Sequence, residues 1–97
     1  MKKCQFYSMM RTDNGPAAVL HDGYTDGTYY YYKLKGARWC AIHPVNGVQV
    51  AYAHTRKECA ENAHAPGMAE KIAEALQRMQ DAAQRYADAV EKAKGAA

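Results

Sequence analysis

Four consecutive tyrosines in the segment Thr28–Lys35, which Gly36 closes, constrain the fold of this chain more than any other feature. Aromatic side chains favour a pleated, half-buried surface, so this segment is predicted to be a β-strand. Side chains on a strand alternate between its two faces. One face then carries Tyr30, Tyr32 and Leu34, and the other carries Tyr29, Tyr31, Lys33 and Lys35. We expect the first face to line a core and the second, the Tyr/Lys face, to bind a partner.

The length of 97 residues predicts a single domain over residues 1–97, with a β-meander in 1–53 and a helical part in 54–97. A chain this short buries a modest core, which favours binding over catalysis in a deep cleft and is compatible with an oligomer.

Three cysteines, an odd number without framework spacing, indicate a reducing compartment. The basic start Met1-Lys2-Lys3 is followed by residues too polar for a signal peptide. No run reaches the roughly 18 apolar residues of a membrane span. These features predict a soluble, cytoplasmic protein with no membrane partner.

The net charge of +3 is unevenly distributed along the chain. Residues 1–53 carry six Lys or Arg and three Asp, whereas residues 54–97 carry seven charges of each sign. The whole excess therefore belongs to the tyrosine-rich half. It is mild, because a dedicated DNA-binding domain is usually more basic.

The first half is predicted to be an antiparallel meander of four or five strands. Strand-like segments alternate with turn chemistry, such as Asn14-Gly15 and the loop Pro44-Val45-Asn46-Gly47, because Asn-Gly accepts positive φ. The expected strands are Cys4–Met10, Ala17–His21, Thr28–Lys35, Arg38–His43 and Val48–Ala53.

Helical signals begin after residue 53. Thr55 and Glu58 fit a capping box, which predicts a short helix over Arg56–Ala63. Pro66 suits the first turn of another helix, expected over Gly67–Lys94. Its apolar residues form one stripe, made of Ile72, Leu76, Met79, Ala83, Tyr86, Val90 and Ala93. Strands followed by helices predict an α+β fold, with the helices packed on one face of the sheet.

The expected last helix is too long for the sheet. About 27 residues at ~1.5 Å each span ~40 Å, whereas five strands cover only ~24 Å. The C-terminal turns must therefore overhang, fray, or pack on another copy or a partner. We expect Met79, Tyr86 and Val90 to form a homodimer interface or a second partner contact.

The Tyr/Lys face allows three interpretations. It could dock on a protein, since tyrosine is enriched at binding hot spots. Its rings could instead stack on bases while lysines contact phosphates. Other elements could also cover both sheet faces. Protein docking is favoured, and the predicted partner-binding residues are Tyr29, Tyr31, Lys33, Lys35, Arg38 and Trp39.

Cys40, His43, Cys59 and His64 have zinc-like residue types and spacings. Residues three apart on a strand point to opposite faces, and residues five apart on a helix differ by ~140°. Buried cysteines and surface histidines are therefore favoured over a metal site. A Cys40 or Cys59 nucleophile with His43 or His54 as base is also disfavoured, because nothing nearby lowers a thiol pKa. We predict no catalytic residue and no cofactor.

Three pieces of the sequence follow one another as the end of a β-meander and a helix start: Trp39-Cys40-Ala41-Ile42, Asn46-Gly47-Val48 and Thr55-Arg56-Lys57-Glu58-Cys59. This layout is similar to the arm-type DNA-binding domains of phage and transposon integrases, over about 25 residues. The resemblance implies DNA binding.

More broadly, a short cytosolic chain with a small sheet, a long helix and no enzymatic motif resembles the accessory proteins of phages and mobile elements. Anti-CRISPR and related anti-defence inhibitors belong to that class. The resemblance implies a non-enzymatic protein that occupies a surface of a host nuclease or nucleoprotein complex. The alternative is a small nucleic-acid-binding regulator that uses the Tyr/Lys face.

Overall fold

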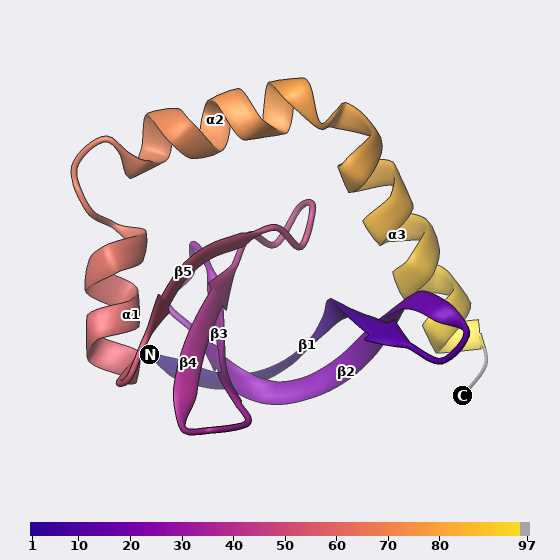
Figure 1. Cartoon of the computed structure of the whole chain (residues 1–97), viewed down its shortest axis with the longest axis horizontal. Coiled ribbons are helices and arrows are strands. Elements are labelled where there is room, and N and C mark those ends of the chain that lie inside the picture. Colours follow the sequence, from indigo (N-terminus) through magenta and orange to yellow (C-terminus); the bar gives the residue numbers. More distant parts are fainter. Residues whose placement is uncertain (96–97) are drawn as a thin grey trace.

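The computed structural model describes residues 1–95, in which five strands form one antiparallel sheet and three helices follow (Figure 1). The strands, in their order across the sheet, are β1 (Lys2–Thr12), β2 (Gly15–Thr25), β3 (Tyr30–Leu34), β4 (Arg38–Ile42) and β5 (Gln49–Ala53). The helices are α1 (Arg56–Ala63), α2 (Met68–Arg78) and α3 (Gln80–Gly95). The predicted α+β fold is confirmed, and α1 has the predicted bounds.

The β1–β2 hairpin is long and curls away from the rest of the sheet. Each of its strands has 11 residues in continuous register. However, β2 pairs with β3 at only two positions, Tyr24↔Tyr31 and Thr25↔Tyr30. The hairpin then folds over one face of β3, where the Phe6 ring stacks on Tyr30 with their centroids 4.7 Å apart. The sheet is therefore strongly curved.

Gly23 makes this curvature possible. It is buried, and a Cβ atom at this position would collide with the carbonyl oxygen of Tyr31 and lie 2.7 Å from Cε1 of Phe6. The hairpin can approach β3 so closely because Gly23 has no side chain.

Both faces of the sheet are buried at its centre. On one face, Tyr31, Ala41 and Ala51 of the sheet and Tyr29, which directly precedes β3, pack with Cys59 and Ala63 of α1. On the opposite face, Phe6 of the curled hairpin covers Tyr32, Cys40 and Ile42. One layer is therefore closed by a helix and the other by the sheet's own first hairpin.

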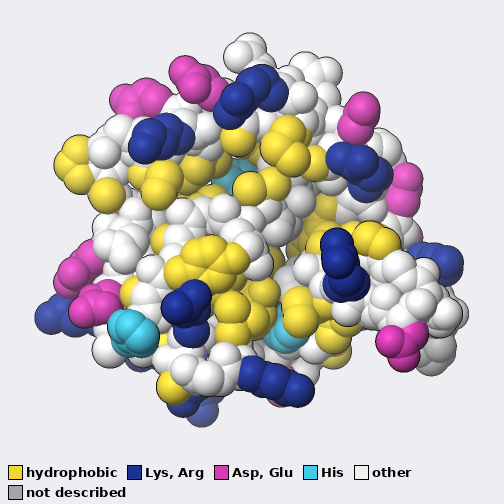
Figure 2. Space-filling model, viewed as in Figure 1, with side chains coloured by type: hydrophobic (Ala, Val, Ile, Leu, Met, Phe, Trp, Pro, Cys, Tyr) yellow, Lys and Arg dark blue, Asp and Glu magenta, His cyan; other side chains and the backbone are white. Residues whose placement is uncertain are grey.

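The helix predicted over Gly67–Lys94 is instead two helices. Met79 leaves the helical conformation with φ −116° and ψ 46°, which separates α2 from α3. Figure 1 shows α1 and α3 at opposite ends of the sheet and α2 running between them. In Figure 2 hydrophobic side chains gather around the hollow below α2, while charged side chains occupy the outer side of the helices.

The break at Met79 lets α3 turn back onto the β1–β2 hairpin. Tyr86 is buried there: its hydroxyl donates a hydrogen bond to the Tyr7 carbonyl, and its ring lies against Gly47. The premise that Tyr86 must overhang the sheet, fray, or pack on another copy or a partner is therefore wrong, because it packs on the hairpin of its own chain. The premise assumed one straight helix, whereas two shorter helices follow the curved sheet.

We expect Gly23→Ala to lower the free energy of unfolding by at least about 2 kcal/mol, because the new Cβ meets backbone that cannot move aside cheaply. Chemical denaturation measures this change. Gly95→Ala is the matched control, since a Cβ there meets no atom within 4 Å. Equal stability of wild type and Gly23→Ala would contradict the close approach of the hairpin to β3.

Candidate docking surface

The structure buries the two tyrosines at the centre of the Tyr/Lys face. Tyr31 is 0 % exposed and Tyr29 is 6 % exposed. Helix α1 covers them, and its small residues Cys59 and Ala63 allow close packing on the rings. The prediction that Tyr29 and Tyr31 form an exposed surface is therefore wrong, because both are core residues.

A polar network ties this covered face to the end of α1. The Asp26 carboxylate accepts hydrogen bonds from the Tyr31 hydroxyl at 2.6 Å and from Nε2 of His64 at 2.7 Å. The backbone N–H groups of Thr28 and Tyr29 both donate to its other oxygen at 2.9 Å. Because His64 is the C-cap of α1, the network fixes that end of the helix.

The pKa of Asp26 reflects this network. Burial alone would raise the pKa of the carboxyl, but the hydrogen bonds from Tyr29, Tyr31, His64 and Thr28 outweigh burial and hold it well below its ordinary value. Asp26 is therefore ionised at neutral pH, as an acceptor of four hydrogen bonds must be.

An aromatic and cationic surface lies at the other end of α1. The Arg56 guanidinium is 4.0 Å from the centroid of the Tyr24 ring and 5.9 Å from that of Trp39, and the two rings are 6.0 Å apart. Exposed Lys33 is directly opposite Trp39 in the β3–β4 register and so lies on the same face. We call Tyr24, Lys33, Trp39 and Arg56 the Trp39 patch. Its three stacked side chains are half-buried.

The remaining predicted cations lie at the rim of this surface. Lys35 and Arg38 are exposed at the β3–β4 turn. Side chains alternate along β4, so Arg38 points to the opposite face from its neighbour Trp39. Of the predicted partner-binding residues, the structure thus brings Lys33 and Trp39 together and turns Arg38 away.

Sequence reasoning missed Tyr24 and Arg56. Arg56 follows Thr55, the N-cap of α1, so the sequence alone predicts a cation in the first turn of this helix. Its two aromatic partners were not, since they come from β2 and β4 and meet only when α1 docks on the sheet.

The cysteines and histidines weighed as metal ligands or catalytic groups are dispersed. Cys40 and Cys59 belong to the packed layers on opposite faces of the sheet, and His64 binds Asp26. Within residues 1–95, no three His, Cys, Asp or Glu side chains are grouped as metal ligands would be. Burial raises the pKa of the Cys40 and Cys59 thiols to about 11, so both are protonated and closed to solvent. A thiolate nucleophile needs the opposite setting.

A second polar pair, not anticipated from the sequence, lies under the curled hairpin. The Ser8 hydroxyl oxygen and Nε2 of His21 are 2.6 Å apart, and the His21 ring stacks on Tyr32. Burial lowers the pKa of His21, which favours its neutral form. Ser8 is 1 % exposed, and the hydrogen bond joins β1 to β2 within the hairpin, while the stacked His21 ring packs the hairpin on β3.

The residues expected to make a second contact differ in accessibility. Met79, at the break between α2 and α3, is 44 % exposed, Val90 is half-buried and Tyr86 is buried. Of these three residues, Met79 alone has an exposed apolar side chain.

No family model, curated protein or solved structure matches this chain. Across residues 1–95, no helix has both the length and the apolar character needed to cross a membrane. Inference about function therefore rests on the surfaces that the fold creates.

The Asp26 network predicts a pH-dependent contribution to stability. Because folding lowers the pKa of Asp26, its stabilising effect is complete above the ordinary value of about 3.9 and is lost as the pH falls below that value. Asp26→Asn should therefore lower the thermal midpoint at pH 7, and the difference from wild type should shrink near pH ~3. Asp13→Asn, in the exposed β1–β2 turn, is the control. Equal midpoints for wild type and Asp26→Asn at pH 7 would refute this role.

Proposed function

We propose that this chain is a non-enzymatic binding protein that docks on a macromolecular partner through the Trp39 patch. The observation that carries the proposal is the Arg56 guanidinium held over Tyr24 and beside Trp39. Trp, Tyr and Arg are the residues most enriched at binding hot spots. Here they are already packed on one another, so little side-chain freedom is lost on binding.

The charges around the patch define the chemistry of the partner. Lys33 and Lys35 are exposed on or beside it, and Lys57 is exposed on the first turn of α1. Glu58 is the only acidic residue in that turn. A complementary surface carries carboxylates or phosphates, since opposite potentials steer association and fix orientation.

The resemblance to phage and mobile-element accessory proteins suggests the kind of partner. We take the partner to be a host defence nuclease or its nucleoprotein complex, which this protein inhibits by occupying a surface. A cationic patch suits the acidic protein surface of such a complex, and the small size of the chain suits stoichiometric blocking rather than turnover.

The second candidate is a small nucleic-acid-binding regulator. It is favoured by the cations beside partly exposed rings, because Lys33 and Lys35 can reach phosphates while Trp39 stacks on a base. The two functions differ in salt dependence. Phosphate contacts release counterions and give a steep loss of affinity with salt, which a protein interface centred on aromatic residues need not show.

We expect Lys33→Glu to weaken binding by at least about tenfold while leaving the thermal midpoint unchanged, because Lys33 is exposed and lies inside the patch. Lys71→Glu, exposed on α2, makes the same change in net charge away from the patch and should bind like wild type. Affinity capture from host lysate, with and without nuclease treatment, measures both variants. Labelled duplex DNA, single-stranded DNA and RNA are tested alongside across a salt series.

A captured protein that survives nuclease treatment and is lost only in Lys33→Glu supports the docking function. Direct binding of the labelled nucleic acids that collapses with salt and with Lys33→Glu supports the regulator. Equal behaviour of Lys33→Glu and Lys71→Glu in both assays would refute the Trp39 patch as the binding surface.

A further inference from the structure

The two edges of the sheet differ in how far other elements cover them. The β5 edge is covered by α1: the Asn62 amide donates to the Tyr52 carbonyl at 3.2 Å, and the Cys59 thiol lies 3.7 Å from the Ala51 carbonyl oxygen. Within residues 1–95, no element gives the β1 edge such cover along its first half, where Lys2, Lys3 and Gln5 are exposed. An uncovered edge strand presents unpaired backbone groups to any extended chain that approaches it.

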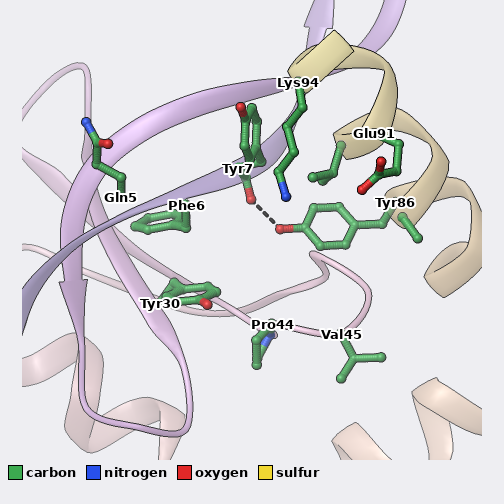
Figure 3. A pocket seen from close by; sticks show the side chains of 11 residues that line it. Gln5, Phe6, Tyr7, Tyr30, Pro44, Val45, Tyr86, Glu91 and Lys94 are labelled. Carbon is green, nitrogen blue, oxygen red and sulfur yellow. Dashed lines mark hydrogen bonds between the residues drawn. The ribbon is translucent and has the colours of Figure 1, made fainter.

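The backbone groups that face outward can be assigned. The carbonyl of Tyr7 points away from β2, since it accepts the hydroxyl of Tyr86 from α3 (Figure 3). Outward and inward groups alternate along an antiparallel strand, so Lys3 and Gln5 also direct their N–H and C=O groups outward. In the described part of the chain, the Tyr86 hydroxyl is the one hydrogen-bonding group that reaches this edge.

A hollow of about 460 Å³ lies beside this open edge (Figure 3). Its walls are the stacked rings of Phe6 and Tyr30 on one side and Tyr86 with Val45 on the other. The hollow is large enough for one apolar side chain. A strand paired with β1 sends alternate side chains to each face, and one of them would enter this hollow.

We propose that an extended, acidic segment of a partner protein adds to β1 as a sixth strand. The open stretch Lys2–Phe6 has room for about five residues, or ~17 Å of strand. Backbone hydrogen bonds to Lys3 and Gln5 provide affinity, and an apolar side chain in the hollow provides specificity. This site is separate from the Trp39 patch and stands whether or not that patch binds a partner.

Charge and geometry select this occupant over a second copy of the chain. Lys2 and Lys3 are both exposed at the open end of the edge, whereas Glu91 and Lys94 on the α3 rim of the hollow offset each other. If two copies paired antiparallel through β1 with Gln5 at the centre, Lys3 of each copy would lie opposite Tyr7 of the other. Helix α3 already covers the position of Tyr7 and blocks this pairing. Pairing centred on Lys3 itself would bring the lysines of both copies together. An acidic segment meets neither obstacle.

The acetylated peptide Glu-Val-Glu-Phe-Glu-Val-Glu is the probe for this site, added to the isotope-labelled full chain and followed by the NMR signals of its backbone amides. We expect the amides of Lys3 and Gln5 to shift and those of Cys4 and Phe6, which face β2, to stay. A peptide with lysine at every glutamate position should bind at least about tenfold more weakly. A peptide with proline at both valines cannot pair and should not bind.

Gln5→Pro tests the edge from the side of the protein. Proline removes the outward N–H while leaving the ladder to β2 intact, so the affinity for the probe should fall at least about tenfold. Gln5→Ala is the matched control: it removes only the side-chain hydrogen bond to Asp22 and should bind like wild type.

The proposal is overturned if the probe shifts neither Lys3 nor Gln5, or if the proline-bearing peptide binds as well as the probe. It is also overturned if the free chain sediments as a dimer that Gln5→Pro dissociates, because the occupant would then be a second copy. The peptide series needs only the wild-type chain, so the outcome does not depend on whether Gln5→Pro folds.

Discussion

The hydroxyl of Tyr31 is buried and must have a hydrogen-bond partner, and the arrangement of the sheet and α1 follows from how this need is met. Asp26 accepts that hydrogen bond and also binds His64 at the C-terminal end of α1. The helix is thereby held over the tyrosine face, and its first turn places Arg56 on the rings of the Trp39 patch. The candidate docking surface thus depends on a part-buried hydrogen bond at the edge of the core.

The curvature of the sheet determines which other surface stays open. Because Gly23 lets the β1–β2 hairpin fold over β3, the hairpin itself closes one face of the sheet, and α3 has to bend at Met79 to follow it. The bend puts Tyr86 against the middle of β1 and leaves the first half of that strand uncovered. Lys3 in this open half is directly opposite Tyr24, so the strand edge and the Trp39 patch are neighbouring surfaces.

Local signals in the sequence were sufficient for the five strands and for α1, but not for the break between α2 and α3 or for the surfaces. Thr55 accepts the Glu58 N–H at 3.1 Å, and α1 starts where the capping pattern predicts. Coverage of the tyrosines depends on small residues about thirty positions later, Cys59 and Ala63, which no periodicity links to β3. No proline or glycine marks the break at Met79 between α2 and α3. The break follows from the packing of α3 on the curved hairpin. Tertiary contacts also determine which aromatic rings stay partly exposed, namely Tyr24 and Trp39 beside Arg56.

Hydroxyl-radical footprinting of the free protein tests most directly whether α1 covers the tyrosine face and so forms the Trp39 patch. Tyr52, which is 43 % exposed, serves as the internal reference for a reactive tyrosine. The structure predicts rapid modification of Tyr52 and none of Tyr31, with Tyr29 close to unreactive. Modification of Tyr31 as fast as that of Tyr52 would show that α1 does not cover this face, and the docking surface described here would not exist.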